Sequence, residues 1–161
     1  FDRSDDRHYD TISAFIKSMR GSDPQAAILY LAIMLDGGED PLFIARRLVI
    51  FSSEDIGNRD PQAGIIAMNS LQAVKLIGMP EAQIILAQAV TYLSCAPKSN
   101  ASYMAIKSAM KFVQERPTIQ IPDHLKNFPP PNAKEKYLYP HMNIIPLFHI
   151  SEKDFRISGL K

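Results

Sequence analysis

The stretch from Arg46 to Pro61, RRLVIFSSEDIGNRDP, contains the side chains of this sequence that look most able to do chemistry. Two arginines, Arg46 and Arg47, precede an acidic pair, Glu54 and Asp55. Such a set fits an active site with paired carboxylates, a salt-bridged helix end, or a surface that meets another subunit. Acid–base catalysis by carboxylates normally needs a positioned histidine, lysine or nucleophile beside them, and none accompanies this pair. We therefore expect no catalytic residue and favour the two structural interpretations.

The spacing within this stretch supports that preference. On a helix, Arg47 and Glu54 share a face but lie about 10 Å apart along the axis, too far for an ordinary i, i+4 ion pair. Glu54 and Asp55 also fall near the predicted helix C-terminus, where the helix dipole disfavours negative charge. Residues that break a local rule in this way usually have a partner elsewhere. Arg46, Arg47, Glu54 and Asp55 are thus predicted to form a structural network within the subunit or at a subunit interface.

A second candidate lies in the stretch CAPKSNASY, residues 95–103, where Lys98 precedes a predicted helix start. A helix N-terminus beside a lysine can hold a phosphate group. Two further lysines, one and two helical turns on, would extend a basic strip. The alternative is a Pro-containing turn followed by a helix cap and solvated lysines. The candidate phosphate or DNA contacts are Lys98, Ser99, Asn100, Lys107 and Lys111.

Other reactive groups carry little signal. Cys95, the single cysteine, lies in an apolar segment without a nearby histidine, so we expect an inert core thiol in a reducing compartment. The four histidines show no metal-ligand spacing with cysteine or carboxylates, so no metal site is expected. The sequence contains neither GxxxxGK[ST] nor GxGxxG, the usual nucleotide-binding loops. We therefore expect no cofactor in this chain.

Helical signals must position these residues, and they dominate to about Glu115. Ile12, Phe15, Ile16 and Met19 follow the i, i+3, i+4, i+7 rule of a helix with one buried face. Three Asp-Pro pairs each predict a helix start, because the aspartate caps the helix and the proline fits its first position. The predicted helices after the first run over residues 24–36, 41–55 and 61–77, from about 80 to 94, and from about 100 to 115. The helix over 24–36 is apolar nearly all round, which predicts a central position.

The composition changes at Arg116. Seven of the twelve prolines lie between Pro117 and Pro146, which predicts an extended or irregular arm, since proline fixes φ and lacks a donor. Residues 143–161 have some strand-like content. The predicted fold is all-α, a bundle of about six helices over residues 1–116. A Pro-rich extended C-terminal arm over 117–161 would pack on the bundle or on a neighbouring subunit.

The bulk composition sets limits on the function. The chain has 161 residues, 46% hydrophobic and 22% charged, enough for one domain with a core. A net charge of +1 creates no field that would indicate nucleic acid or a membrane. The longest apolar run, Ala26–Leu35, is too short to span a bilayer, so no membrane partner is expected. The chain has no signal peptide and starts at Phe1, so we expect a piece of a larger cytoplasmic protein.

Four stretches together resemble the C-terminal region of one family. They are HYDTISAFIKSMRGSDPQAAILYLAIML (8–35), GEDPLFIARRLVIFSSEDIGNRDPQA (38–63), IGMPEAQIILAQAVTYLSCAPKSNASY (77–103) and IPDHLKN (121–127). The family is that of replication-associated recombination protein A, also called RarA or MgsA. Its members are bacterial AAA+ ATPases of the clamp-loader group, related to the Werner-helicase-interacting protein.

The resemblance implies a clamp-loader collar-like helical domain that assembles subunits into a homotetramer. It also implies ATP and Mg²⁺ as cofactors of the full-length protein, with the ATPase core outside this fragment. The implied partners are a second copy of the chain, DNA forks or gaps, and single-stranded-DNA-binding protein, in a nucleoid-associated setting. The other hypothesis is a DNA- or protein-binding module that does not assemble by itself and uses a strip of Lys98, Lys107, Lys111, Arg116 and Lys126.

Overall fold

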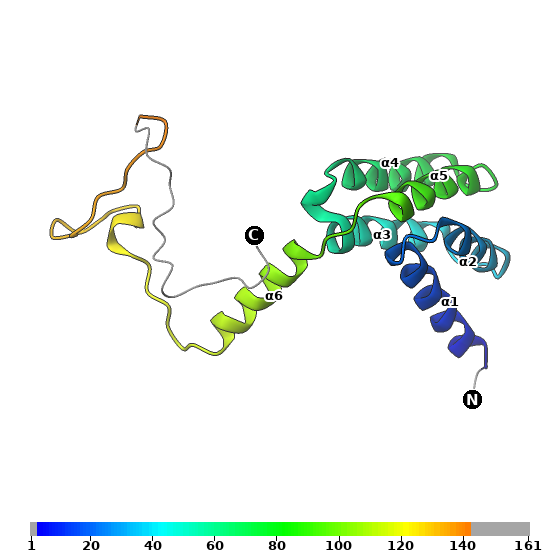
Figure 1. Ribbon diagram of the computed structural model, residues 1–161, viewed down its shortest axis with the longest axis horizontal. Helices are drawn as coiled ribbons and strands as arrows, with labels where there is room; N and C mark the ends of the chain where they lie inside the picture. The colour runs from blue at the N-terminus through cyan, green and yellow to red at the C-terminus, as the bar shows by residue number, and fades with distance from the viewer. Residues whose placement is uncertain (1–2, 143–161) are drawn as a thin grey trace. The chain divides into compact units, whose positions relative to one another are not determined.

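The computed structural model describes residues 3–142, and over that range it consists of helices and loops without a strand (Figure 1). The predicted all-α class is confirmed. The strand-like segment 143–161 lies outside the described residues. The helices are α1 (Arg3–Arg20), α2 (Pro24–Asp36), α3 (Pro41–Phe51), η1 (Ser52–Ile56), η2 (Gly57–Arg59), α4 (Gln62–Ile77), α5 (Ala82–Cys95), α6 (Ala101–Gln114) and η3 (Asp123–Leu125).

The three Asp-Pro pairs start helices as predicted. Each aspartate accepts a hydrogen bond from a backbone N–H of the first turn, which satisfies one of the donors that a helix start leaves open. The acceptor and donor pairs are Asp23 with Ala26 at 3.0 Å, Asp40 with Leu42 at 2.9 Å and Asp60 with Gln62 at 3.1 Å. These caps place the starts of α2, α3 and α4 within one residue of the predicted positions.

The helix predicted over 41–55 changes its winding before its end. Its α-helical part stops at Phe51 and continues as the π-helix η1 to Ile56. A π turn holds more residues than an α turn and therefore rotates the side chains that follow it. Asp55 and Ile56 both face the interior as a result, with 7% and 0% exposure. Gly57, at φ +55°, then ends the segment.

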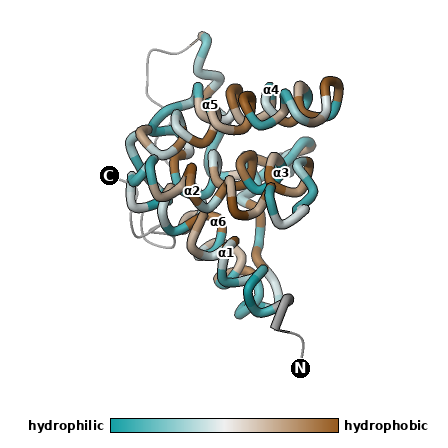
Figure 2. The backbone as a smooth tube through the Cα atoms, turned by 90° about the vertical axis from the view of Figure 1, so that its right-hand side faces the viewer, coloured by the Kyte–Doolittle hydropathy of each residue, from teal (hydrophilic) through white to brown (hydrophobic). Residues whose placement is uncertain are grey.

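The chain divides between Met104 and Ala105 into two units. In the first unit, α4 and α5 lie side by side over α2 and α3, as both views show (Figures 1 and 2). Helix α5 packs against α1, α2, α3 and α4. The largest fully buried apolar side chains are Phe15, Met19, Ile44, Leu48, Phe51, Ile56, Leu86, Val90 and Leu93.

Helix α2 does not occupy the central position that its composition predicted, so that prediction was wrong. It buries Ala27, Leu31 and Met34, while Leu29 is 58% exposed. The extensive contacts of α2 are with α1 and α5 alone, so one face of it stays open. An apolar composition shows how much surface a helix could bury. How much it does bury depends on how many other helices pack against it.

The second unit contains most of α6, the short helix η3 and the Pro-rich segment up to residue 142. Helix α6 buries none of its residues. The Arg116 guanidinium lies 3.3 Å from the centre of the Phe112 ring, a cation–π contact. Phe128 and Tyr137 of the arm are exposed. The predicted division into residues 1–116 and 117–161, and the surface on which the arm packs, stay predictions.

Candidate functional site

Asp55, the second residue of the acidic pair, finds its charged partner on α1. Arg20 donates from Nε to Asp55 Oδ1 at 2.8 Å and from a terminal nitrogen to Asp55 Oδ2 at 3.4 Å. The hydrogen bond to Asp55 raises the pKa of Arg20, and Glu54 adds to this through its charge. The backbone of Asp55 also accepts from the Ser99 N–H at 2.7 Å. Asp55 therefore joins the end of α1, the π-helix and the segment that leads into α6.

The two arginines of the stretch take no part in this pair. Arg46 is exposed, and Arg47 is partly buried with its Nε enclosed and without an acceptor among the described residues. Neither forms an ion pair with Glu54 or Asp55 in residues 3–142. Arg20 was not predicted, because a basic residue in the last turn of a helix satisfies the helix dipole and gives no sign of a distant partner. Whether these residues meet another subunit stays a prediction.

The Lys98 side chain is hydrogen-bonded within the chain. Its Nζ donates to the carbonyls of Ser94 at 2.8 Å and Ala96 at 2.5 Å, and to the Ser22 hydroxyl at 3.2 Å. Burial lowers the pKa of this ammonium group. These bonds satisfy carbonyls that the end of α5 leaves open. Lys98 therefore caps the C-terminus of α5 and, through Ser22, also contacts the turn between α1 and α2.

The other candidate phosphate contacts lie just before α6 or on it. Ser99 accepts from the Ala101 N–H at 3.3 Å, as a helix cap does, and Asn100 is exposed. Lys107 and Lys111 lie exposed on α6. The Lys111 Nζ lies 3.9 Å from a carboxylate oxygen of Glu115, one turn on, so this pair is solvent-exposed and weak.

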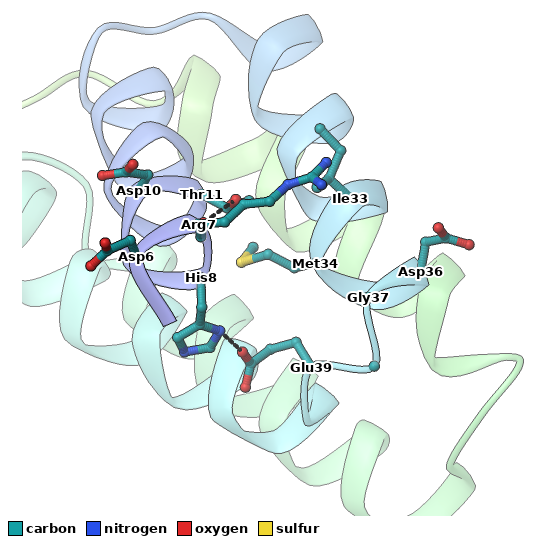
Figure 3. Close-up of a pocket in the computed structure, with 11 residues that line it drawn as sticks. Asp6, Arg7, His8, Asp10, Thr11, Ile33, Met34, Asp36, Gly37 and Glu39 are labelled. Atoms are coloured by element: carbon teal, nitrogen blue, oxygen red, sulfur yellow. Dashed lines mark hydrogen bonds and ion pairs between the residues drawn. The ribbon is translucent and has the colours of Figure 1, made fainter. Parts of the chain in front are cut away.

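A hollow of about 1000 Å³ lies between the first half of α1 and the end of α2 (Figure 3). Met34 lines it, and Arg7 extends across it toward α2. His8 Nδ1 lies 2.8 Å from Glu39 Oε2 at one end. The Thr11 hydroxyl donates to the Arg7 carbonyl at 2.7 Å, within the helix. This set links α1 to the loop after α2 and contains no nucleophile paired with a base.

The outer face of the α4–α5 pair was not predicted from the sequence. The 34 residues from Gln62 to Cys95 contain two charged side chains, Lys75 and Glu81, whereas 22% of the whole chain is charged. Apart from Lys75, the exposed side chains of α4 and α5 are uncharged, and several are large and apolar. We call this surface the α4–α5 face, and it consists of Ile65, Met68, Asn69, Gln72, Leu76, Ile84, Gln88, Thr91 and Cys95.

Cys95 belongs to this face and is exposed, so the prediction of a core thiol was wrong. It follows Ile84, Gln88 and Thr91 along one side of α5, opposite buried residues such as Leu93. An apolar neighbourhood in sequence does not decide on which side of a helix a residue lies. The scarcity of charge over two successive helices was the sequence signal that could have revealed the whole face.

The sequence has no phosphate-binding loop, and the described part of the chain holds no group of three or more His, Cys, Asp or Glu side chains that could bind a metal ion. In residues 3–142, no helix is both long enough and apolar enough to cross a membrane.

Comparisons with known proteins agree on one family. The family model described as MgsA AAA+ ATPase C terminal matches residues 21–146. An uncharacterized AAA domain-containing protein of Mycobacterium tuberculosis is 54% identical over 79% of this chain and 28% of its own length. Replication-associated recombination protein A of Escherichia coli is 44% identical over 88% of this chain and 33% of its own length. The ATPase WRNIP1 of Dictyostelium discoideum is 37% identical over 84% of this chain and 15% of its own length.

The chain thus spans about a third or less of these relatives. The matched residues include α2 to α6, with the caps, the π-helix and the α4–α5 face described above. This chain belongs to the family of MgsA AAA+ ATPase C-terminal domains.

Proposed function

We propose that this chain is the self-assembly domain of an AAA+ ATPase that acts in DNA replication, recombination and repair at stalled forks. In this proposal the domain holds four subunits together as a homotetramer. The family and the name of the Escherichia coli relative support the cellular role. The structure supports the assembly role through the surface that it leaves open.

The α4–α5 face carries the proposal. A single folded chain seldom exposes a large continuous apolar surface, and uncharged surface of this kind is typical of protein contacts. On this face Ile65 is 53% exposed and Met68 is 44% exposed, with Asn69 and Gln72 between Met68 and Leu76. Covering these side chains with another subunit would remove apolar area from water without the cost of burying an unpaired charge.

The hydrogen bonds that Asp55 makes with Arg20 and Ser99 also support the assembly role. These contacts fix the end of α1 and the segment before α6 relative to the π-helix. A subunit interface needs such fixed elements, because a surface that is ordered beforehand loses less conformational freedom on binding.

The remaining activities belong to the longer protein in this proposal. ATP and Mg²⁺ would be bound by the AAA+ modules of the longer protein, as the family implies. Forked or gapped DNA and single-stranded-DNA-binding protein would be partners of the intact ATPase.

The alternative is a DNA- or protein-binding module that does not assemble by itself, and its DNA-binding form receives less support. A phosphate contact needs a cation free to approach the backbone. Lys98, the centre of the predicted strip, already donates to three acceptors within the chain. The nine side chains of the α4–α5 face include no lysine or arginine.

The mass of the 161-residue chain, measured by light scattering during size exclusion over a concentration series, tests the proposal. We expect a mass near four times 18.1 kDa that persists on dilution. A monomer at every concentration would refute the assembly role. Salt-dependent binding of that monomer to forked DNA would then favour the alternative.

A further inference from the structure

Four large, exposed apolar side chains lie at or next to the connection between α4 and α5. Leu76 is 84% exposed, Ile77 56%, Met79 45% and Ile84 73%. We call these four residues the tip patch. Leu76 and Ile77 end α4, Met79 lies in the short connection, and Ile84 lies in the first turn of α5. Side chains this large and this exposed at one end of a helix pair indicate a surface that a partner covers.

Two opposite charges flank the tip patch. Lys75 directly precedes Leu76, and Glu81 lies between Met79 and Ile84 in the sequence. These two are the charged residues of the segment from Gln62 to Cys95. Both are exposed, and neither forms an ion pair with another residue in the described part of the chain. The tip therefore has an apolar centre and a rim with one positive and one negative side chain. This is the arrangement found in protein interfaces.

This composition selects the kind of partner. DNA binding requires several cations for the phosphates, and an anionic lipid surface attracts clusters of lysine and arginine, so one lysine beside one carboxylate suits neither. A surface with one charge of each sign can be complementary to itself. Two-fold symmetry makes every cross-subunit pairing reciprocal, so one contact can place Lys75 of each copy against Glu81 of the other with the apolar centres between them.

We propose that the tip patch is a two-fold contact between copies of this chain, with Lys75 of one copy paired with Glu81 of the other. The inference rests on the proposed assembly role and names the surface and symmetry of one of its interfaces. A homotetramer built with two-fold axes needs such isologous contacts. The rest of the α4–α5 face then lies beside this contact.

Charge reversal tests the pairing, with the mass of the 161-residue chain as readout. Lys75→Glu and Glu81→Lys each place like charges at both cross-subunit pairs, so each variant alone should assemble on the order of tenfold more weakly. Mixing the two variants restores an opposite pair at both positions, so the mixture should recover assembly in mixed oligomers. The double variant, Lys75→Glu with Glu81→Lys, should assemble like the wild type.

Substitution at the apolar centre gives a second, independent measurement. Ile84→Glu should reduce the assembly at least as strongly, because it buries a charge in the contact. Ile50→Glu, at an exposed isoleucine of α3, is the matched control and should leave the mass unchanged. Circular dichroism would show that both variants keep the helical fold.

The outcomes separate the two proposals. If the wild type is oligomeric but Ile84→Glu leaves its mass unchanged, or if mixing the charge variants restores nothing, the tip contact is refuted while the assembly role stands. If the wild type is a monomer at every concentration, the assembly role fails and the tip contact fails with it.

Discussion

Arg20 Nε lies 2.8 Å from Asp55 Oδ1, and this bond joins residues 35 positions apart in the sequence. The Asp55 side chain is 9% exposed, whereas the Arg20 side chain is 47% exposed. The carboxylate thus has its partner at the edge of the core, and the guanidinium keeps contact with water. This asymmetry decides what happens when either partner is removed.

Arg20→Ala should destabilise the fold more than Asp55→Asn. Without Arg20, a buried carboxylate loses its charged donor, which costs about 2 kcal/mol. Without the carboxylate charge, the guanidinium can hydrate, so the loss should be about 1 kcal/mol. Urea unfolding of the two single variants and the double variant measures both losses and their coupling. The reverse order of the two losses would contradict this account.

Gly57 and Gly64 should respond to alanine in opposite directions. Gly57 has φ +55° and ψ −135°, a conformation that side chains rarely adopt, so Gly57→Ala should cost about 1–3 kcal/mol. Gly64 lies inside α4, where an added Cβ would meet the Ser52 hydroxyl at an ordinary 3.9 Å. Gly64→Ala should therefore gain about 0.5–1 kcal/mol through helix propensity. Thermal unfolding followed by circular dichroism measures both changes, and a loss at Gly64 would show that α4 is packed more tightly than described.

Lys98→Met should destabilise the chain, because it removes the donors that cap α5 and hold the Ser22 hydroxyl. We expect a loss of about 1–2 kcal/mol in the free energy of unfolding. Lys111→Met, at an exposed lysine with a weak partner, is the matched control and should stay within about 0.5 kcal/mol of the wild type. Equal effects of the two substitutions would mean that Lys98 has no special part in the fold.

Tyr92 should make stability depend on alkaline pH. Its hydroxyl donates to Asp60 Oδ2 at 2.7 Å, and this hydrogen bond, with some desolvation, raises the pKa of Tyr92 above the ordinary 10.0. Because the folded-state pKa is raised, the contribution is present in full below pH 10 and is lost as the pH rises through the folded-state pKa. Tyr92→Phe should therefore unfold at a lower temperature than the wild type at neutral pH. That difference should shrink above pH 10, and a constant difference over this range would contradict the assignment.

The helix starts were determined by the sequence, since capping is local. An aspartate accepts a hydrogen bond from a residue two or three positions on, and the following proline has the φ that a helix needs, so Asp23, Asp40 and Asp60 act without help from distant residues. The change at Arg116 from helical to Pro-rich sequence is local for the same reason. These signals placed α2, α3 and α4 almost to the residue.

The tertiary structure decided the roles of the candidate residues. Asp55 pairs with Arg20 rather than with its sequence neighbours, and Lys98 caps a helix rather than standing free for phosphate. Cys95 faces outward although its neighbours in sequence are apolar. These outcomes depend on how far each helix is rotated about its axis and on which other helices approach it. Contacts between residues distant in sequence determine both, and in this chain the π turn at Ser52–Ile56 further changes the faces that helical periodicity predicts.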